Sequence, residues 1–376
     1  MAKKKQFKNL TESALRKKWA DSGLAENIVV EPEKMLWIPS RFLALNDLTG
    51  GGAAYGKIHE IFGEESSGKS LAALDFAYST IALGGQVLWA DAEFAFTRQW
   101  ALTNGLDLKK VELLKGKAIE EISDWSVDMA TYYRSKLTNN EPILLVVDSV
   151  AACDTLENLN SPQVDRKAEM GNRAKAMDMF LRSRNNIYEN LGVTVILINQ
   201  LRKKIGASKF EDPDTTPGGA AAKFYASIRL GFYGGKSITR KIKGKEYRIG
   251  RVTSIRAKKN KIAPPKPTIK AAPVYFIEEA VEGVGFDKYF GLPDILERKG
   301  VLKRKPGSSR YFMKGSDKAI ATSEEKLLLL LRDDDNLRRK LLRKAGINTI
   351  NTTAKKIDAI KENLYPVKLS KEKDDE

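Results

Sequence analysis

Near the start of the chain, small and polar residues lead to a lysine and a serine in the run Gly63-Glu64-Glu65-Ser66-Ser67-Gly68-Lys69-Ser70. The spacing G-x-x-x-x-G-K-S is that of a phosphate-binding loop. Its backbone N–H groups surround phosphates, its lysine reaches the β- and γ-phosphates, and its serine hydroxyl binds Mg²⁺. A Gly/Ser-rich turn would explain the glycines but not the Lys-Ser pair. We therefore expect a nucleoside triphosphate to bind here.

The residues on both sides of this loop predict the elements that position it. Residues 56–62 predict a short buried strand, and Leu71, Leu74, Tyr78 and Ile81 recur behind the loop at helical spacing. A strand, a glycine loop and a helix in this order direct backbone N–H groups and a helix N-terminus at phosphates.

Acidic and amide residues end three further predicted strands. Asp148 ends the apolar run 143–148, where an acid can orient Mg²⁺ rather than simply face solvent. Asp91 and Glu93 close the strand 86–90, where an acid can activate the attacking water. Glu93 is our candidate general base, although spacing alone does not choose between the two acids. Asn199-Gln200 closes the strand 193–200, where an uncharged amide can hydrogen-bond a γ-phosphate.

Alternating strand and helix patterns over residues 34–285 predict an α/β core with a mostly parallel sheet covered by helices. A long helix is expected over 168–191, and further strands over 225–232 and 274–277. The segment 1–33 is expected to form a short helical arm. This arm would dock either on its own core or on a neighbouring subunit, and the sequence does not choose. The composition changes again over 286–376, which predicts a small basic domain with a charged tail.

The net charge of +17 and the pI near 9.6 are the strongest compositional features of the 376-residue chain. Such an excess favours polyanions, above all nucleic acid, although a generic basic surface would give the same numbers. No apolar run approaches the roughly 20 residues of a membrane span, and the first residues do not predict a secretory signal. A single cysteine suits a cytoplasmic protein. We expect His59 and Cys153 to be structural.

Several segments, taken together and in order, resemble the RecA recombinase family. The resemblance extends from about Ile38 to Phe312 and fades in the N-terminal arm and the last sixty or so residues. Besides the phosphate-binding loop, the segments that carry it are Asp91-Ala92-Glu93, Val147-Asp148-Ser149-Val150-Ala151-Ala152, Ile198-Asn199-Gln200-Leu201-Arg202-Lys203-Lys204-Ile205-Gly206, Gly218-Gly219, Lys223-Phe224-Tyr225-Ala226-Ser227 and Lys259-Asn260-Lys261-Ile262-Ala263-Pro264.

The resemblance implies a RecA-like P-loop ATPase core with a mostly parallel sheet flanked by helices, a short N-terminal helical arm and a small C-terminal α/β lobe. It also implies roles at an ATP and Mg²⁺ site. Glu93 would activate water, Gln200 would couple the γ-phosphate to DNA binding, and Ser70 and Asp148 would hold the metal. The implied nucleotide-binding residues are Gly63, Glu64, Glu65, Ser66, Ser67, Gly68, Lys69, Ser70, Leu71, Trp100 and Asp148.

Further implied residues concern the subunit interface and DNA. Phe224, Lys259 and Lys261 would lie at a filament interface, where the two lysines would reach the ATP of the neighbouring subunit. Two loops, over about 158–172 and 201–219, would bind DNA, with apolar side chains wedged between bases and basic ones on phosphates. The implied DNA-binding residues are Met170, Gly171, Asn172, Lys175, Arg182, Arg202, Lys203, Lys204, Ile205, Gly206, Gly218 and Gly219.

The resemblance thus implies a DNA-dependent ATPase that forms helical filaments on single-stranded DNA and exchanges strands with homologous duplex DNA. Single-strand-binding and loader proteins are further candidate partners. The alternatives are a hexameric helicase on the same core and a non-catalytic DNA-annealing protein. The chain departs from the family at four positions. Trp100 and Thr97 replace a tyrosine and an aspartate that contact adenine, Glu64 replaces a proline, and Lys203 replaces a methionine. Residues 234–256 are also longer and more basic than the family predicts.

Overall fold

The computed structural model describes residues 35–161, 169–203, 214–242, 244–264, 266, 268–276 and 284–347. Contacts divide the chain into a unit Met1–Met35 and a unit Leu36–Glu376, and the fold described below belongs to the second. The predicted arm over 1–33 lies outside the described residues, and so do Lys204, Ile205 and Gly206 of the predicted DNA loops. The division into three segments at 33 and 285 therefore stays a prediction.

The described core is built on a nine-stranded sheet with the order β13-β12-β11-β10-β3-β7-β6-β4-β5. Neighbours from β10 to β5 pair in parallel, whereas the β10–β11, β11–β12 and β12–β13 pairs are antiparallel. The strands are β3 (Ile58–Gly63), β4 (Gln86–Asp91), β5 (Val111–Leu114), β6 (Ile143–Asp148), β7 (Val193–Gln200), β10 (Ile228–Ile242), β11 (Lys245–Asn260), β12 (Ile269–Tyr275) and β13 (Gly285–Phe286).

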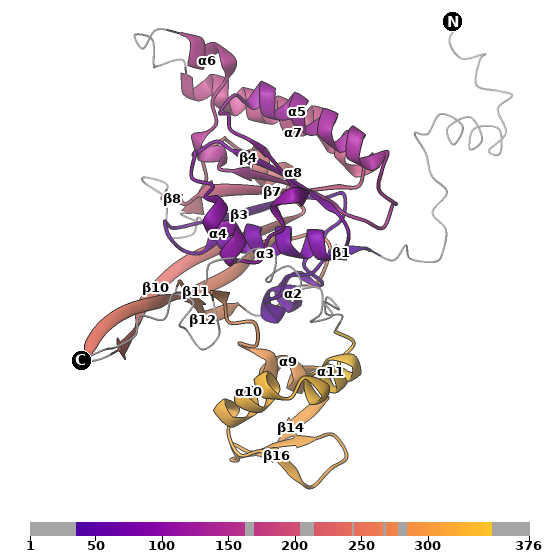
Figure 1. Cartoon of the computed structure of the whole chain (residues 1–376), viewed down its shortest axis with the longest axis vertical. Helices are drawn as coiled ribbons and strands as arrows, with labels where there is room; N and C mark the ends of the chain where they lie inside the picture. The colour runs from indigo at the N-terminus through magenta and orange to yellow at the C-terminus, as the bar shows by residue number, and fades with distance from the viewer. Residues whose placement is uncertain are drawn as a thin grey trace, which may run out of the picture. The chain divides into compact units, whose positions relative to one another are not determined.

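Helices cover both faces of this sheet (Figure 1). The described core helices are α2 (Leu43–Thr49), α3 (Lys69–Ala82), α4 (Arg98–Thr103), α5 (Ile119–Arg134), α6 (Leu156–Asn160), α7 (Glu169–Asn190) and α8 (Ala221–Tyr225). Side chains of α2 and α3 share one apolar core with the sheet, and those of α5, α7 and α8 share another. Two 3₁₀ turns, Leu108–Lys110 and Val150–Ala152, and the short strands β1 (Trp37–Ile38), β2 (Ala53–Ala54), β8 (Arg202–Lys203) and β9 (Asp214–Thr215) complete the core.

The central strand β6 shows why the sequence forms this layered arrangement. All six of its residues are buried, as the continuous apolar run predicted. Leu144 and Val146 join the core under α3, whereas Leu145 and Val147 join the core under α5 and α7. Successive side chains of a strand point to opposite faces, so a strand covered on both sides must be apolar throughout. The predicted α/β fold with a mostly parallel sheet is confirmed.

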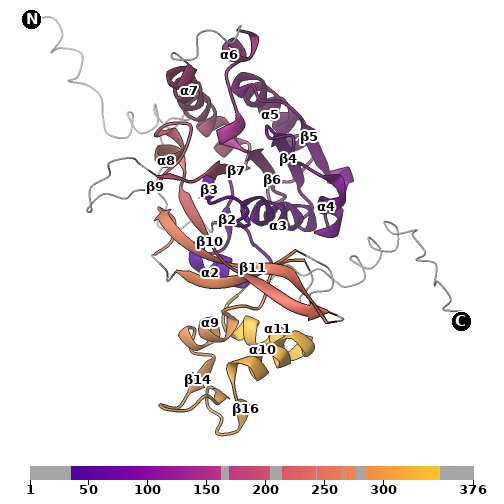
Figure 2. The ribbon, with the colours of Figure 1, turned by 90° about the vertical axis from the view of Figure 1, so that its left-hand side faces the viewer.

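The largest difference from the sequence-based expectation lies in β10 and β11. We expected strands over 225–232 and 274–277 and predicted no helix or strand between them. Instead, β10 begins at Ile228 and pairs with β11 in a long antiparallel hairpin, which projects from the core in Figure 2. Tyr225 ends α8, because the Ala226 N–H donates to the Ala222 carbonyl and closes that helix. The prediction was wrong for Tyr225 and Ala226 because their apolar alternation belongs to a helix end.

Residues 292–347 add a small lobe with an apolar core of its own, which Leu43 of α2 joins. Its three-stranded antiparallel sheet has the order β14-β15-β16. Leu302 begins the first of these strands after the turn at Gly300. The lobe consists of α9 (Leu292–Arg298), β14 (Leu302–Arg304), β15 (Tyr311–Met313), β16 (Ala319–Ala321), α10 (Glu324–Asp333) and α11 (Asp335–Lys344). Among the described helices, none combines the length and the hydropathy of a membrane span.

A buried charged group joins the three strands at the centre of the sheet. Glu60 of β3 is fully buried and forms an ion pair with Arg229 of β10, at 2.5 Å between Oε2 and Nε. The other carboxylate oxygen accepts a hydrogen bond from the Asn199 side chain of β7, at 3.1 Å. The Arg229 guanidinium also stacks over the Phe62 ring. A buried charge requires such partners, because an unpaired carboxylate in this position would be strongly disfavoured.

Removal of Arg229 should therefore destabilise the fold more than loss of a surface ion pair. We expect Arg229→Met to lower the free energy of unfolding by about 3 kcal/mol, because it leaves the Glu60 carboxylate buried and unpaired. The control is Arg298→Ala, which breaks the exposed pair with Asp47 and should cost less than about 1 kcal/mol. Urea denaturation followed by circular dichroism measures both. Equal losses in the two variants would contradict this account of the buried pair.

Candidate active site

The phosphate-binding loop connects β3 to α3, as its sequence predicts. Gly63 ends β3, and a Cβ atom there would lie 2.2 Å from the Phe232 carbonyl oxygen, so only glycine fits beside β10. Gly68 has a φ of 97°, which favours glycine, and α3 begins at Lys69. The loop thus turns sharply into the helix and presents its backbone N–H groups at the start of α3.

The β10–β11 hairpin holds the loop from outside. The Arg251 guanidinium donates to the Ser66 carbonyl at 2.9 Å and to the Glu65 carbonyl at 3.3 Å. The Thr253 hydroxyl donates to the Ser67 carbonyl at 3.0 Å. With several loop carbonyls bonded to β11, the orientation of the loop backbone is fixed before a ligand arrives. Sequence reasoning did not connect this basic hairpin with the loop.

Lys69 is the first residue of α3, and its side chain turns back to the start of the loop. Its Nζ donates to the carbonyl oxygens of Gly63 and Glu64, at 3.2 and 2.7 Å. Burial lowers the pKa of Lys69, and the negative charges of Glu93 and Asp148 act in the opposite direction. The ammonium group therefore lies within the electrostatic reach of both acids that the sequence singled out.

The acids of β4 and β6 meet beside the loop, because Asp91 and Asp148 are paired in the register of these parallel strands. Asp91 is buried, and its carboxylate accepts hydrogen bonds from the Ala95 and Phe96 N–H groups, each at 3.0 Å. Glu93 is exposed and accepts a hydrogen bond from the Ser149 hydroxyl. The two acids that spacing could not separate thus differ in geometry. The Asp91 carboxylate is already hydrogen-bonded to nearby backbone N–H groups, whereas the Glu93 side chain is exposed.

Asp148 lies next to Ser70, from which its carboxylate accepts a hydrogen bond. Burial, together with the negative charges of Glu93 and Asp91, raises the pKa of Asp148 from 3.8 to about 6, although Ser70 and Lys69 act in the opposite direction. A buried carboxylate surrounded by other acids is costly to ionise, and a divalent cation would remove that cost.

Gln200 connects the loop with the second predicted DNA loop. It is the last residue of β7, its side chain is exposed, and it is paired with Gly63 in the register of β3 and β7. The next residue, Leu201, donates its N–H to the Gly63 carbonyl at 2.9 Å. The chain that follows β7 therefore leaves the sheet directly beside the phosphate-binding loop.

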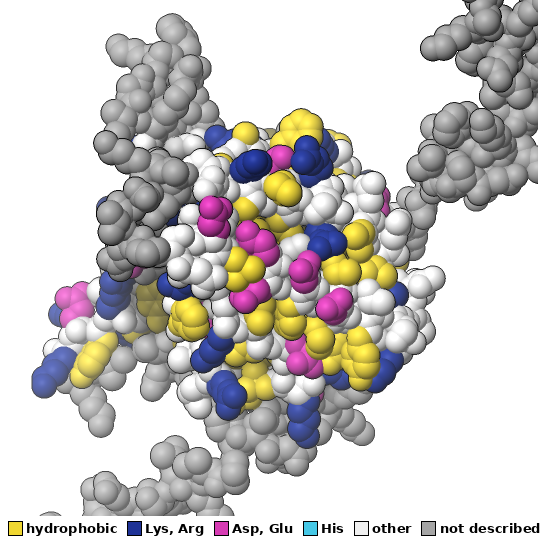
Figure 3. Space-filling view, turned by 90° about the horizontal axis from the view of Figure 1, so that it is seen from above, with side chains coloured by type: hydrophobic (Ala, Val, Ile, Leu, Met, Phe, Trp, Pro, Cys, Tyr) yellow, Lys and Arg dark blue, Asp and Glu magenta, His cyan; other side chains and the backbone are white. Residues whose placement is uncertain are grey.

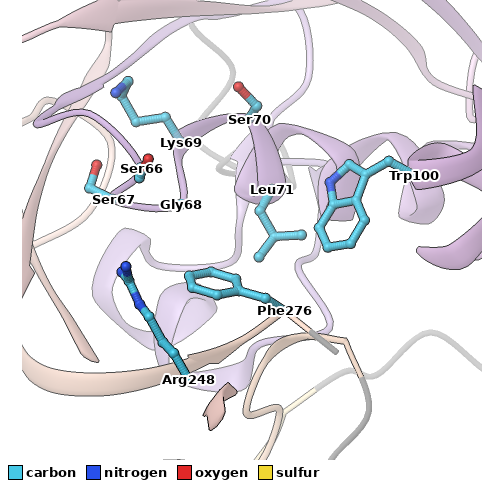
Figure 4. A pocket seen from close by; sticks show the side chains of 9 residues that line it. All are labelled: Ser66, Ser67, Gly68, Lys69, Ser70, Leu71, Trp100, Arg248 and Phe276. Atoms are coloured by element: carbon cyan, nitrogen blue, oxygen red, sulfur yellow. The ribbon is translucent and has the colours of Figure 1, made fainter. Parts of the chain in front are cut away.

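A pocket of about 480 Å³ opens beside the loop and is lined by Ser66–Leu71, Trp100, Arg248 and Phe276 (Figure 4). Trp100, on α4, was predicted to stack on a nucleotide base. Thr97 is not among the lining residues. Sequence reasoning missed Arg248 on β11 and Phe276 directly after β12, because both lie far from the loop in sequence. The unusual length and charge of residues 234–256 was the signal that could have pointed to Arg248.

Comparison with known proteins identifies the family. A family model for the RecA N-terminal domain matches residues 17–278. The chain belongs to the RecA family. It is 35% identical to Protein RecA of Thermotoga maritima over 332 residues, which cover 85% of this chain and 86% of that protein. It is 33% identical to Protein RecA of a Picosynechococcus species over 299 residues, which cover 78% and 79%.

The residues that the RecA resemblance assigns to a subunit interface lie together and away from the pocket. Phe224, on α8, is 72% exposed. The Lys259 Nζ donates to the carbonyl oxygens of Lys223 and Phe224, at 2.6 and 2.9 Å. Burial and the nearby charge of Lys261 lower the pKa of Lys259 to about 8. Neither lysine lines the pocket of its own chain.

The first RecA-like DNA segment is described only at its two ends, residues 158–161 and 169–172. Gly171, Asn172, Lys175 and Arg182 belong to α7, where Gly171, Lys175 and Arg182 are exposed and Asn172 is partly buried. Met170 is the second residue of this helix, but its side chain is not among those described. Seen from above, the described side chains show acidic, basic and apolar groups interspersed (Figure 3). The basic excess of the chain is therefore not concentrated on the part of this face that is described.

The stem of the second RecA-like DNA segment is held by an acid. Arg202 and Lys203 form β8, which pairs with β9, and both side chains are exposed. The Asp214 carboxylate accepts hydrogen bonds from Lys203 at 2.7 Å and from the Tyr233 hydroxyl at 2.6 Å, and forms an ion pair with Lys258. Burial raises the pKa of Asp214, but these partners outweigh it and lower the pKa to about 2. Lys203, predicted to meet DNA, is thus already paired, while Gly218-Gly219 precede Ala220, the N-cap residue of α8.

Proposed function

We propose that the protein is an ATP-dependent recombinase that forms helical filaments on single-stranded DNA. In this proposal it pairs that DNA with a homologous duplex, exchanges strands, and hydrolyses ATP in a DNA-stimulated reaction. The observation that carries the proposal is the arrangement at the carboxyl ends of β3, β7, β6 and β4. These adjacent strands end in the phosphate-binding loop, Gln200, Asp148 and Asp91, and the second candidate DNA loop starts one residue after Gln200.

The residues at the nucleotide site fit Mg²⁺. Ser70 and Asp148 supply a hydroxyl and a carboxylate that already touch, and hard oxygen ligands suit this ion. Among the described residues, no cluster of three or more His, Cys, Asp or Glu side chains could enclose a metal. This matches an ion that takes its remaining ligands from phosphates and water. When bound, Mg²⁺ would neutralise phosphate charge during phosphoryl transfer.

The remaining groups divide the reaction between them. The loop N–H groups and Lys69 bind the phosphates, and Lys69 exchanges its two carbonyl partners for phosphate oxygens. Glu93 takes the proton of the attacking water, since its carboxylate is exposed and is oriented by Ser149. Gln200 binds the γ-phosphate through its amide and, as the last residue before the DNA loop, moves that loop with it.

The DNA-facing residues would be the exposed basic groups on α7 and on β8, namely Lys175, Arg182, Arg202 and Lys203. Contacts between such groups and phosphates carry no sequence preference, which suits a protein whose specificity comes from base pairing. The other predicted DNA residues complete the two loops in this proposal, namely Met170, Gly171, Asn172, Lys204, Ile205, Gly206, Gly218 and Gly219.

The catalytic assignment predicts a specific kinetic effect. We expect Glu93→Gln to retain ATP binding and to lose DNA-stimulated turnover by at least about 100-fold, because removal of a general base costs that much. Glu325→Gln, which changes an exposed glutamate on α10, serves as the control and should behave as wild type. Phosphate release with and without single-stranded DNA is measured for all three. Wild-type turnover that ignores DNA, or an unaffected Glu93→Gln protein, would contradict the proposed mechanism.

The raised pKa of Asp148 predicts a pH dependence. Protonated Asp148 cannot bind Mg²⁺, and the pKa of Asp148 in the protein without nucleotide is about 6. The Mg²⁺-dependent part of ATP affinity should therefore be constant near pH 8 and fall about tenfold per unit below pH 6. Calorimetry between pH 5 and pH 8 measures it. Asp148→Asn should bind ATP with Mg²⁺ weakly, and its affinity should change with pH only through the ionisation of ATP itself. If Asp148→Asn kept the steep pH dependence of the wild type, the titrating group would be a different residue.

The exposed Phe224 predicts how the filament is held together. We expect Phe224→Ala to need at least a tenfold higher protein concentration for filament formation, because truncation of an aromatic anchor commonly costs 2 kcal/mol or more. The control is Tyr132→Ala, an exposed aromatic on α5. Electron microscopy with ATP and single-stranded DNA counts the filaments. Closed rings in the wild-type sample would instead favour a hexameric helicase.

A further inference from the structure

Arg248 brings a positive charge into the nucleotide pocket from a part of the chain that the phosphate-binding loop does not supply. It lies on β11, about 180 residues after the loop, and it lines the same pocket as Ser66–Leu71 and Trp100. Figure 4 shows its guanidinium beside the Phe276 ring and directed toward the loop. The guanidinium carbon lies 5.8 Å from the centre of that ring, within the range of a cation–π contact.

A bulge in the hairpin explains why Arg248 faces the loop. Gly250 pairs with Ile238 and Arg248 pairs with Thr239, so Ile249 is an extra residue on β11. Without the bulge, residues 248 and 251 would point to opposite faces of the strand, because their separation is odd. An inserted residue reverses this alternation and redirects the side chains beyond it. Arg251 and Arg248 can therefore both serve the loop.

The two arginines differ in what they bind. Arg251 is committed to the loop carbonyls of Glu65 and Ser66. Arg248 is exposed, and within the described part of the chain no carboxylate forms an ion pair with it. A guanidinium that faces a pocket, rests on an aromatic ring and has no described counter-charge is suited to an anionic ligand. Its planar fork can bind two phosphate oxygens at once.

We propose that Arg248 binds the phosphate groups of the nucleotide, in the same chain as the phosphate-binding loop. This inference rests on the proposed nucleotide site and adds a residue to it. The base would lie against Trp100 and Phe276, whose rings stack on any base without reading its edge. Affinity at this site would therefore come mainly from the phosphates, through the loop, Lys69 and Arg248.

The experiment compares three variants of the full chain by displacement of a fluorescent ADP analogue, in the absence of DNA. We expect Arg248→Ala to weaken ATP and GTP by the same factor of about ten, the usual size of a lost charged hydrogen bond at an accessible site. Adenosine, which has no phosphate, should bind wild type and Arg248→Ala with equal affinity in the same displacement assay. Arg248→Lys should lose less, since it keeps the charge without the fork. The control, Lys245→Ala, removes the same charge from the same strand outside the pocket lining and should change ATP affinity less than twofold.

Several outcomes would overturn the inference. ATP affinity of Arg248→Ala within twofold of wild type would show that the guanidinium does not meet the ligand. An equal loss with adenosine would place the contact on the base or ribose. A loss in Lys245→Ala as large as that in Arg248→Ala would reduce the effect to general electrostatics. A wild-type chain that binds no ATP would instead contradict the proposed function, so the two failures are distinguishable.

Discussion

The buried carboxylate of Glu60 accepts hydrogen bonds from side chains of the strands on both sides of β3. Its partners are Asn199 on β7 and Arg229 on β10, and Asn199 also donates to the Pro217 carbonyl at 3.0 Å. These contacts fix three strands whose ends carry the candidate site. β3 leads into the phosphate-binding loop, β7 leads into Gln200, and Pro217 lies at the end of the second candidate DNA loop. Because an ion pair at this depth tolerates little displacement, the three segments keep a fixed relation to one another.

The hairpin formed by β10 and β11 extends this arrangement to the outside of the loop. Arg251 and Thr253 fix the loop carbonyls, and a one-residue bulge brings Arg248 to the pocket. The loop is thus held between the sheet and the hairpin of its own chain. Lys259, at the other end of β11, lies beside Phe224 on an exposed surface. β11 therefore carries Arg248, which lines the pocket of its own chain, and Lys259, which the resemblance assigns to the ATP of a neighbouring subunit.

The sequence predicted the parallel core well, because its determinants are local. The apolar run of β6, the spacing of the loop and the acids after each strand all follow from short stretches of chain. Only the structure distinguishes Asp91 from Glu93, because the turn at Ala95 and Phe96 shows that the Asp91 carboxylate accepts hydrogen bonds from two backbone N–H groups. Arg248 and the pairing of Lys203 with Asp214 depend on a bulge and on contacts between distant segments, which no periodicity encodes. The helix end at Tyr225 was mistaken for a strand because five residues are too few to show a helical period.

The contact between Lys259 and α8 has a consequence for how neighbouring subunits would sense their ligands. The Lys259 ammonium rests on the carbonyls of Lys223 and Phe224, which are among the last acceptors of that short helix. To leave them, it must find an anion that attracts it more strongly than two peptide dipoles at the negative end of a helix. In the proposed filament, a triphosphate of the neighbouring subunit would compete with these carbonyls better than a diphosphate, because its negative charge is larger. The position of Lys259 in one subunit would then depend on whether the adjacent subunit holds a triphosphate or a diphosphate.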